Sequence, residues 1–218
     1  MSLSFLRSEL VDIISVNNVV FQSIIKYPNI KISTGKTTFI HGPSGCGKST
    51  LLKLINGTIP PESGEIIYNG EDIENIDTIK LRREILLVSQ SVYLFTGTIE
   101  ENFKKYYEYR DHVVLPKEDM EKFLKICSAD LPLETRCETM SGGERQRVYI
   151  AIFLSFMPKV ILLDEPTSAL DNISSDRMMN NIKSFSTDNE MTIIVVSHYL
   201  PLAEKYGDNI IALERSKP

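Results

Sequence analysis

A glycine-rich segment at residues 42–50 constrains this chain more than any other feature of its sequence. The segment fits the spacing G-x-x-x-x-G-K-[S/T], with an apolar strand predicted at 37–41 and a helix predicted from Lys48 to about Gly57. Glycines let the backbone approach phosphate oxygens, and the start of a helix presents unpaired N–H groups to an anion. We therefore expect a phosphate-binding loop made of Gly42, Pro43, Ser44, Gly45, Cys46, Gly47, Lys48, Ser49 and Thr50.

Two side chains of this loop have the chemistry to handle a nucleoside triphosphate. The Lys48 ammonium can bridge the β- and γ-phosphates, and the Ser49 hydroxyl can hold Mg²⁺. An ordinary glycine turn is the simpler alternative, but it needs neither the lysine nor the strand and helix on its two sides. A nucleoside triphosphate with Mg²⁺ is therefore the expected ligand of this loop.

A pair of acids follows a second apolar strand, at 160–163. Asp164 and Glu165 stand directly after Val-Ile-Leu-Leu, so they are placed at the carboxyl end of a buried strand. Ligands bind at that end of an open α/β sheet. We expect Asp164 to hold Mg²⁺, directly or through water, and Glu165 to act as the general base for an attacking water.

A second helix N-terminus with glycines lies at 140–147, which reads Met-Ser-Gly-Gly-Glu-Arg-Gln-Arg. Ser141 is a good N-cap, and Gly142 and Gly143 free the backbone beside it. An anion-binding role is then available here too, with Glu144 in the first turn. One nucleotide does not obviously need two such sites, whereas two chains arranged head to tail would use one from each.

Together these residues resemble the ATP-binding subunit of ABC transporters. The segment 140–147 resembles the family signature LSGGQxQR, and Asp164–Asp171 (DEPTSALD) matches the family's Walker B and D-loop run. Gln90 follows the predicted strand 85–89 where the family has its Q-loop glutamine. His198 follows the predicted strand 192–197 where the family has its switch histidine. The resemblance extends over residues 11–213.

The resemblance implies a sandwich dimer with two ATP molecules at the interface. Each ATP would lie between Gly42–Thr50 of one chain and Ser141–Glu144 of the other, with Asp171 of the D-loop nearby. Gln90 would touch Mg²⁺ or the attacking water, and His198 would contact the γ-phosphate. ATP hydrolysis would open the dimer, and the motion would pass to an integral membrane permease.

The resemblance also implies a fold: a P-loop NTPase (RecA-like) core with an N-terminal antiparallel β subdomain and an inserted α-helical subdomain. The residues themselves favour an α/β domain, because predicted strands and helices alternate along the chain. The segment from about 91 to 157 is mostly helical in pattern. We therefore predict one ABC ATPase domain over 1–218, with a core at about 1–90 and 158–218.

Composition narrows the location and the partners. With a net charge of −5, the chain is not expected to present a broad basic face that binds nucleic acid. Met1–Leu10 has no apolar run of a secretory signal, and no segment approaches the roughly 20 apolar residues of a membrane helix. Three cysteines without a CxxC pair fit a reducing compartment. We expect a peripheral protein at the cytoplasmic face of the cell membrane, bound to the membrane only through the permease.

The chain departs from the family pattern at a few positions. Family members usually stack an aromatic side chain on adenine, and that position falls near Ser23, with Phe21 and Tyr27 on either side. Which aromatic stacks is left open. Glu144 replaces the glutamine of the signature and adds negative charge, and Cys46 lies inside the phosphate loop.

The subtype rests on resemblance alone. The run GPSGCGKSTLLK, Gly70–Asp72 and the segment 156–160 look most like small bacterial ATP-binding subunits assigned to iron export. The alternative is a soluble ABC ATPase of DNA repair or translation, but such chains carry long coiled coils or two ATPase halves. A P-loop kinase or GTPase would leave Ser141–Glu144 and Asp164–Asp171 without a role.

Overall fold

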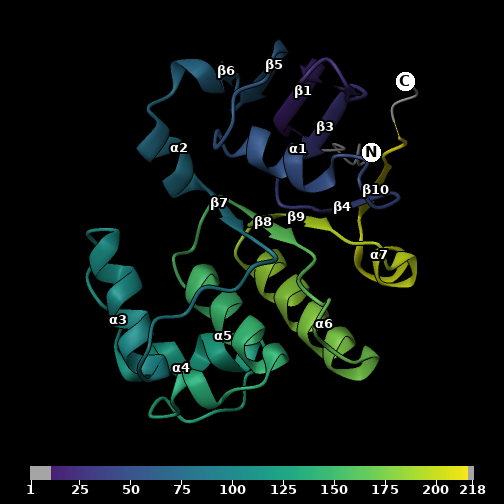
Figure 1. Ribbon diagram of the computed structural model, residues 1–218. Coiled ribbons are helices and arrows are strands. Elements are labelled where there is room, and N and C mark those ends of the chain that lie inside the picture. The colour runs from purple at the N-terminus through teal and green to yellow at the C-terminus, as the bar shows by residue number, and fades with distance from the viewer. Residues whose placement is uncertain (1–10, 216–218) are drawn as a thin grey trace, which may run out of the picture.

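The structure is a computed structural model that describes residues 11–215 of the 218-residue chain. The expectation about Met1–Leu10 lies outside these residues. Figure 1 shows an antiparallel sheet beside a parallel sheet, with a group of helices at the far side of the parallel sheet. This arrangement confirms the expected α/β fold class.

The antiparallel sheet is built around β1, which pairs with β2, β3 and β5, while β5 also pairs with β6. Side chains alternate along β1, with Ile14 and Val16 fully buried and Ser15 between them at the surface side. Asn69 and Gly70 both have positive φ and form the tight turn that an Asn-Gly pair predicts. The strands are β1 (Asp12–Phe21), β2 (Ile25–Lys26), β3 (Ile30–Ser33), β5 (Ser63–Tyr68) and β6 (Glu71–Asp72).

The parallel sheet has the order β10-β4-β9-β8-β7, with every neighbouring pair parallel. Its central strands are continuous apolar runs, as expected for strands covered on both faces. In β8, Val160 and Leu162 pack toward α1 and the antiparallel sheet, whereas Ile161 and Leu163 pack toward the helices of the other face. The strands are β4 (Thr37–His41), β7 (Ile85–Val88), β8 (Val160–Asp164), β9 (Thr192–Val196) and β10 (Asn209–Ala212).

The structure has seven α-helices within residues 11–215, and three of them form a group. Three of them, α3, α4 and α5, follow one another between β7 and β8 and lie together below the parallel sheet in Figure 1, as the helical pattern of that segment predicts. The long helix α6 runs beside them, and neither α6 nor α7 was predicted from the sequence. The helices are α1 (Lys48–Ile55), α2 (Thr78–Glu84), α3 (Ile99–Tyr109), α4 (Lys117–Ile126), α5 (Gly142–Leu154), α6 (Asn172–Asp188) and α7 (Leu200–Tyr206).

The length and hydropathy of the helices show whether any of them could span a membrane. Within residues 11–215, every helix is too short or too polar to span a bilayer. The longest, α6, has 17 residues and a polar sequence (NISSDRMMNNIKSFSTD). This finding agrees with the absence of a long apolar run in the sequence.

Candidate functional site

The glycine-rich loop connects the carboxyl end of β4 to the start of α1. Gly47 is the N-cap of α1 and has φ 95° and ψ 13°, a left-handed conformation that suits glycine. A Cβ on Gly42 would lie 2.3 Å from the carbonyl oxygen of Leu213, so this position also needs glycine. Within residues 11–215 no side chain caps α1, which leaves its first N–H groups available to an anion.

Lys48 supports the shape of this loop from inside. Its side chain is buried, and Nζ donates to the carbonyl oxygens of Gly42 at 2.8 Å and Pro43 at 3.1 Å. The ammonium therefore lies under the loop, one residue into the helix. A positive charge beneath the loop can form charge-assisted hydrogen bonds with phosphate oxygens.

Ser49 and Asp164 meet at the bottom of the loop, although 115 residues separate them in the chain. The Ser49 hydroxyl donates to Oδ1 of Asp164 at 2.9 Å. Burial raises the pKa of Asp164, and the charge of Glu165 raises it further, while the bond from Ser49 opposes this shift. A cation here would favour the charged carboxylate. The pair supplies the hard oxygen ligands that fit Mg²⁺, which commonly takes only one or two protein ligands beside phosphates and water.

Glu165 and His198 form the second contact of the site. His198 Nδ1 lies 2.9 Å from Oε2 of Glu165, and the Glu165 side chain is only 13% exposed against 69% for His198. Both residues line a cleft of about 400 Å³ together with Gln90 and most of the loop from Ser44 to Thr50. The structure thus brings together residues that the sequence predicted from four separate segments.

Among the described residues that line this cleft, none belongs to the segment Ser141–Glu144. It starts α5 and forms a capping box: Glu144 N donates to Ser141 Oγ at 3.3 Å, and Oε2 of Glu144 accepts from Ser141 N at 2.8 Å. Hydrogen bonds from Ser141 lower the pKa of Glu144. Ser141 and Gly142 are exposed. Within one chain, the two predicted anion sites therefore stay separate.

Asp171 also takes part in a helix cap rather than in the cleft. It is the N-cap of α6, and its carboxylate accepts from Ser174 N at 2.9 Å and Ser174 Oγ at 2.7 Å. These hydrogen bonds lower the pKa of Asp171. The preceding residues touch α5, since a Cβ on Gly143 would lie 2.8 Å from Cδ2 of Leu170 and 2.9 Å from the carbonyl oxygen of Ala169.

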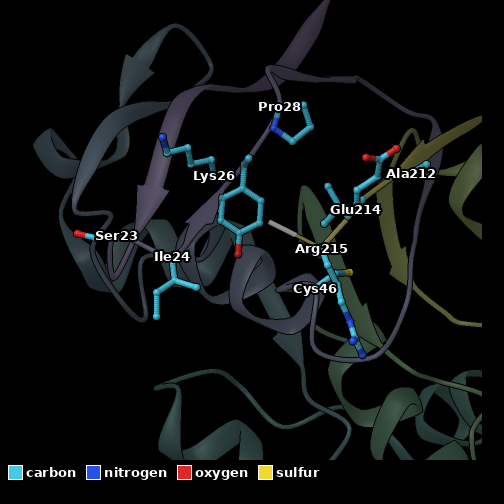
Figure 2. Close-up of a pocket in the computed structure, with 10 residues that line it drawn as sticks. Ser23, Ile24, Lys26, Pro28, Cys46, Ala212, Glu214 and Arg215 are labelled. Carbon is cyan, nitrogen blue, oxygen red and sulfur yellow. The ribbon is translucent and has the colours of Figure 1, made fainter. Parts of the chain in front are cut away.

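A second cavity, of about 920 Å³, lies beside the loop and holds the region where an aromatic residue was expected. In Figure 2, Ser23 and Ile24 lie on one side of it, and Cys46 and Arg215 on the other. Tyr27 is only 6% exposed, and its hydroxyl donates to the carbonyl oxygen of Gly47 at 2.9 Å. Tyr27 therefore supports the loop.

Ser23 itself is tied to the neighbouring sheet. Its backbone N–H and its hydroxyl both donate to the carboxylate of Glu62, the hydroxyl at 2.6 Å. Phe21 packs against the core. The large apolar side chain that is exposed here is Ile24, at 68%. The cavity rim thus offers an aliphatic side chain where the family usually has an aromatic one.

Two contacts of the site were missed by the sequence analysis. Gln146 Nε2 donates to the backbone oxygen of Glu165 at 3.0 Å, and Arg215 donates to the backbone oxygen of Ser44 at 3.0 Å. Gln146 lies inside the segment 140–147, so the motif that contains it could be found in the sequence. Its hydrogen bond to Glu165 could not be predicted, because this contact depends on how α5 packs against the turn after β8.

Comparisons with known proteins find similar sequences among the ATP-binding proteins of transporters. The osmoprotectant import ATP-binding protein OsmV of Salmonella typhimurium is 34% identical over 87% of this chain, and the match covers 50% of that protein, so this chain spans about half its length. The probable iron export ATP-binding protein FetA of Escherichia coli is 33% identical over 80% of this chain and 78% of its own length.

The solved structures give the same result. An ATP-binding cassette in a dimeric post-hydrolysis state, bound to ADP and Pi, superposes with a TM-score of 0.78 at 29% identity, over 94% of this chain and 97% of that chain. The family profile described as ABC transporter matches residues 25–168. On the strength of that match and of these relatives, the chain belongs to the ABC transporter family of ATP-binding proteins.

Proposed function

We propose that this chain is a Mg²⁺-dependent ATPase subunit that drives a membrane transporter. The observation that carries the proposal is the meeting of Ser49 with Asp164 and of Glu165 with His198 around an uncapped helix N-terminus. This set combines an anion site, a cation site and a carboxylate that can accept a proton. Hydrolysis of a nucleoside triphosphate needs these three elements.

Each residue then has a defined task. The N–H groups at the start of α1 and the Lys48 ammonium bind the phosphates of ATP, and Ser49 and Asp164 hold Mg²⁺. Bound Mg²⁺ neutralises charge on the phosphate oxygens. Glu165 orients the attacking water and accepts its proton, while His198 fixes the Glu165 carboxylate and faces the γ-phosphate. Gln90 lines the same cleft, from which it would contact the ion or the water.

The active form is a head-to-tail dimer of two such chains. Ser141 and Gly142 are exposed, and the segment Ser141–Glu144 does not line the cleft of its own chain, so a partner chain is the available source of the second anion site. A solved relative is a dimer with ADP and Pi, which supports this arrangement. Gly42–Thr50 of one chain and Ser141–Glu144 of the other would enclose each ATP, with Asp171 beside it.

The partner in the membrane is a separate permease, and the chain reaches the cytoplasmic face of the membrane through it. Relatives are named for import as well as for export. Iron export is the first cargo to test, because the relative named for it matches over most of both chains. The test is ATPase activity of the complex with and without added metal ions.

The substitution Glu165→Gln tests the ATPase itself. Removing the general base should lower kcat about 100-fold or more, while ATP binding persists and a dimer accumulates. Steady-state hydrolysis and size-exclusion chromatography with Mg²⁺ and ATP measure both effects. Glu190→Gln is the matched control, since Glu190 is exposed and remote from the cleft, and should behave as wild type. Wild-type hydrolysis by Glu165→Gln would contradict the role of Glu165.

The transporter assignment needs a second experiment. Tagged Glu165→Gln protein is incubated with detergent-solubilised native membranes and ATP, and bound proteins are identified. A polytopic membrane protein that is retained with ATP supports the permease. If only soluble proteins bind while ATP still causes dimerisation, the chain is a non-transport ABC ATPase instead.

A further inference from the structure

Gln146 is a buried polar residue that the roles above do not use. It lies in the second turn of α5 and is 4% exposed. Nε2 donates to the backbone oxygen of Glu165 at 3.0 Å. Oε1 is buried and accepts no hydrogen bond from any residue that the structure describes. The amide group therefore has one defined partner, and that partner is the residue with the candidate catalytic carboxylate.

Glu165 needs such support because its backbone is strained. Its φ is 49°, in the left-handed region that residues with a side chain rarely adopt and that persists only where neighbours hold it. The N–H of Glu165 donates to Val196 at 2.9 Å, and its carbonyl oxygen accepts from Ser168 N at a long 3.2 Å. The bond from Gln146 is the shorter of the two on that oxygen.

This backbone turn determines where the Glu165 carboxylate points. It ends β8 and leaves Oε2 at 2.9 Å from His198 Nδ1, at the edge of the cleft. A small change in φ at Glu165, which the bonds to its N–H and its carbonyl oxygen oppose, would turn Cβ about the N–Cα bond and move the carboxylate away from the water that it must deprotonate. General-base catalysis tolerates little displacement, because the base must lie within hydrogen-bond distance of that water.

We propose that Gln146 is a positioning residue for ATP hydrolysis, which holds the Glu165 backbone so that its carboxylate faces the attacking water. The proposal rests on the ATPase function proposed above. Gln146 does not line the cleft that we assign to the nucleotide. It acts through the carbonyl oxygen of Glu165, and its loss should affect the chemical step and leave nucleotide binding unchanged.

Gln146 also lies between two parts of the proposed dimer site, the segment Ser141–Glu144 and Glu165. Ser141 lies five residues earlier on the same helix, which corresponds to about 7.5 Å along its axis. Gly143, between them, packs closely against Ala169 and Leu170. The helix that holds the Glu165 backbone through Gln146 therefore also carries the segment that would face the partner's ATP.

The test is the substitution Gln146→Met, which keeps the length of the side chain and removes the N–H donor. We expect kcat to fall between about 10- and 100-fold, since misplacement by about 1 Å can cost this much. KM and the affinity for a fluorescent ATP analogue should stay within about twofold of wild type. If the Met variant does not fold, Gln146→Leu replaces it.

Two controls separate positioning from a general loss of stability. Ile150→Val, one turn further along α5, removes a buried methylene and should lower the melting temperature without lowering kcat. In the Glu165→Gln background, Gln146→Met should change single-turnover hydrolysis by less than about twofold, because the carboxylate that it positions is already absent.

The outcomes are distinguishable. If wild type hydrolyses ATP and Glu165→Gln does not, but Gln146→Met retains wild-type kcat, the proposal for Gln146 is overturned and the ATPase stands. An equal loss of rate in both backgrounds also overturns it, since Gln146 would then act independently of Glu165. If wild type does not hydrolyse ATP at all, the ATPase proposal and the role of Gln146 fall together.

Discussion

The starts of α1 and α5 are both glycine-rich helix N-termini, yet they are built in opposite ways. Gly47 precedes α1 in a left-handed conformation, without a described side-chain cap and without an acid in the first turn. Ser141 precedes α5 in an extended conformation, and its side chain and that of Glu144 cap the helix reciprocally. One terminus leaves its N–H groups to a ligand, and the other already uses part of them.

We propose that this difference separates a primary anion site from an auxiliary one. An uncapped N-terminus with a lysine beneath it has both the dipole and the charge to bind phosphate alone. At α5, the capping box already uses the N–H groups of Ser141 and Glu144 and holds a carboxylate beside the helix start, so phosphate binding there needs another source of affinity. As proposed, that source is a nucleotide already held by the partner chain, which brings its γ-phosphate to Ser141.

The largest expected effect comes from Lys48→Ala. The substitution removes the ammonium that bonds to Gly42 and Pro43 and that we assign to the phosphates. We expect kcat to fall about 100-fold or more and ATP affinity to fall at least about tenfold. Titration with a fluorescent ATP analogue and steady-state hydrolysis measure the two quantities.

The control for this substitution is Lys80→Ala, because Lys80 is exposed on α2, away from the cleft. It should match wild type in both assays. ATP affinity that survives in Lys48→Ala would mean that the Lys48 ammonium does not bind the phosphates, and that the N–H groups of α1 account for the anion site alone.

Modification of Cys46 should have the next largest effect. The Cys46 residue is only 4% exposed, but it lines the cavity of Figure 2, and this cavity is the route by which a reagent would reach the thiol. Burial raises the pKa of the thiols of Cys127 and Cys137, which makes them less reactive. A bulky thiol reagent should therefore abolish hydrolysis, and ATP should protect. Mass spectrometry locates the label.

Cys46→Ala provides the matched control and should retain activity when the reagent is added. The decisive measurement is activity at complete labelling of Cys46. Unimpaired hydrolysis in that state would show that the loop tolerates a bulky group. It would then be a less restricted anion site than its glycine geometry indicates.

Local patterns made most of this site predictable. The strand, glycine loop and helix at 37–57 follow from short-range rules about glycine and helix starts. The meeting of Ser49 with Asp164 follows from one topological rule, that parallel strands place their carboxyl ends at one edge. These features depend on residues close in sequence or on strand order alone, so no detailed packing is needed to foresee them.

What the sequence could not predict depends on packing between distant elements. The bond from Gln146 to Glu165 exists only because α5 lies against the turn after β8. Tyr27 was open as a base-stacking residue, and its actual hydrogen bond to Gly47 requires β2 to sit beside the loop. Helix α6 was missed because its polar sequence gives little periodicity.

The smallest effect, and the sharpest test of the contrast between α1 and α5, is expected from Glu144→Gln. Glutamine can keep the capping box, so the melting temperature should hardly change, while the negative charge disappears. Removing one half-buried carboxylate beside an incoming phosphate should strengthen ATP-driven dimerisation by only about two- to fivefold. Analytical ultracentrifugation at several ATP concentrations, in the Glu165→Gln background, measures this change.

The pH dependence of that effect follows from the state of the carboxylate. Hydrogen bonds from Ser141 lower the pKa of Glu144 below its ordinary value. The carboxylate is therefore fully ionised at neutral pH. The gain from Glu144→Gln should therefore be constant between about pH 6 and 8. It should diminish only as acid protonates the wild-type residue, below its ordinary pKa of about 4.3. A weaker dimer in the variant would instead mean that the Glu144 charge stabilises the interface. The capped N-terminus of α5 would then not be the weaker anion site that the comparison with α1 predicts.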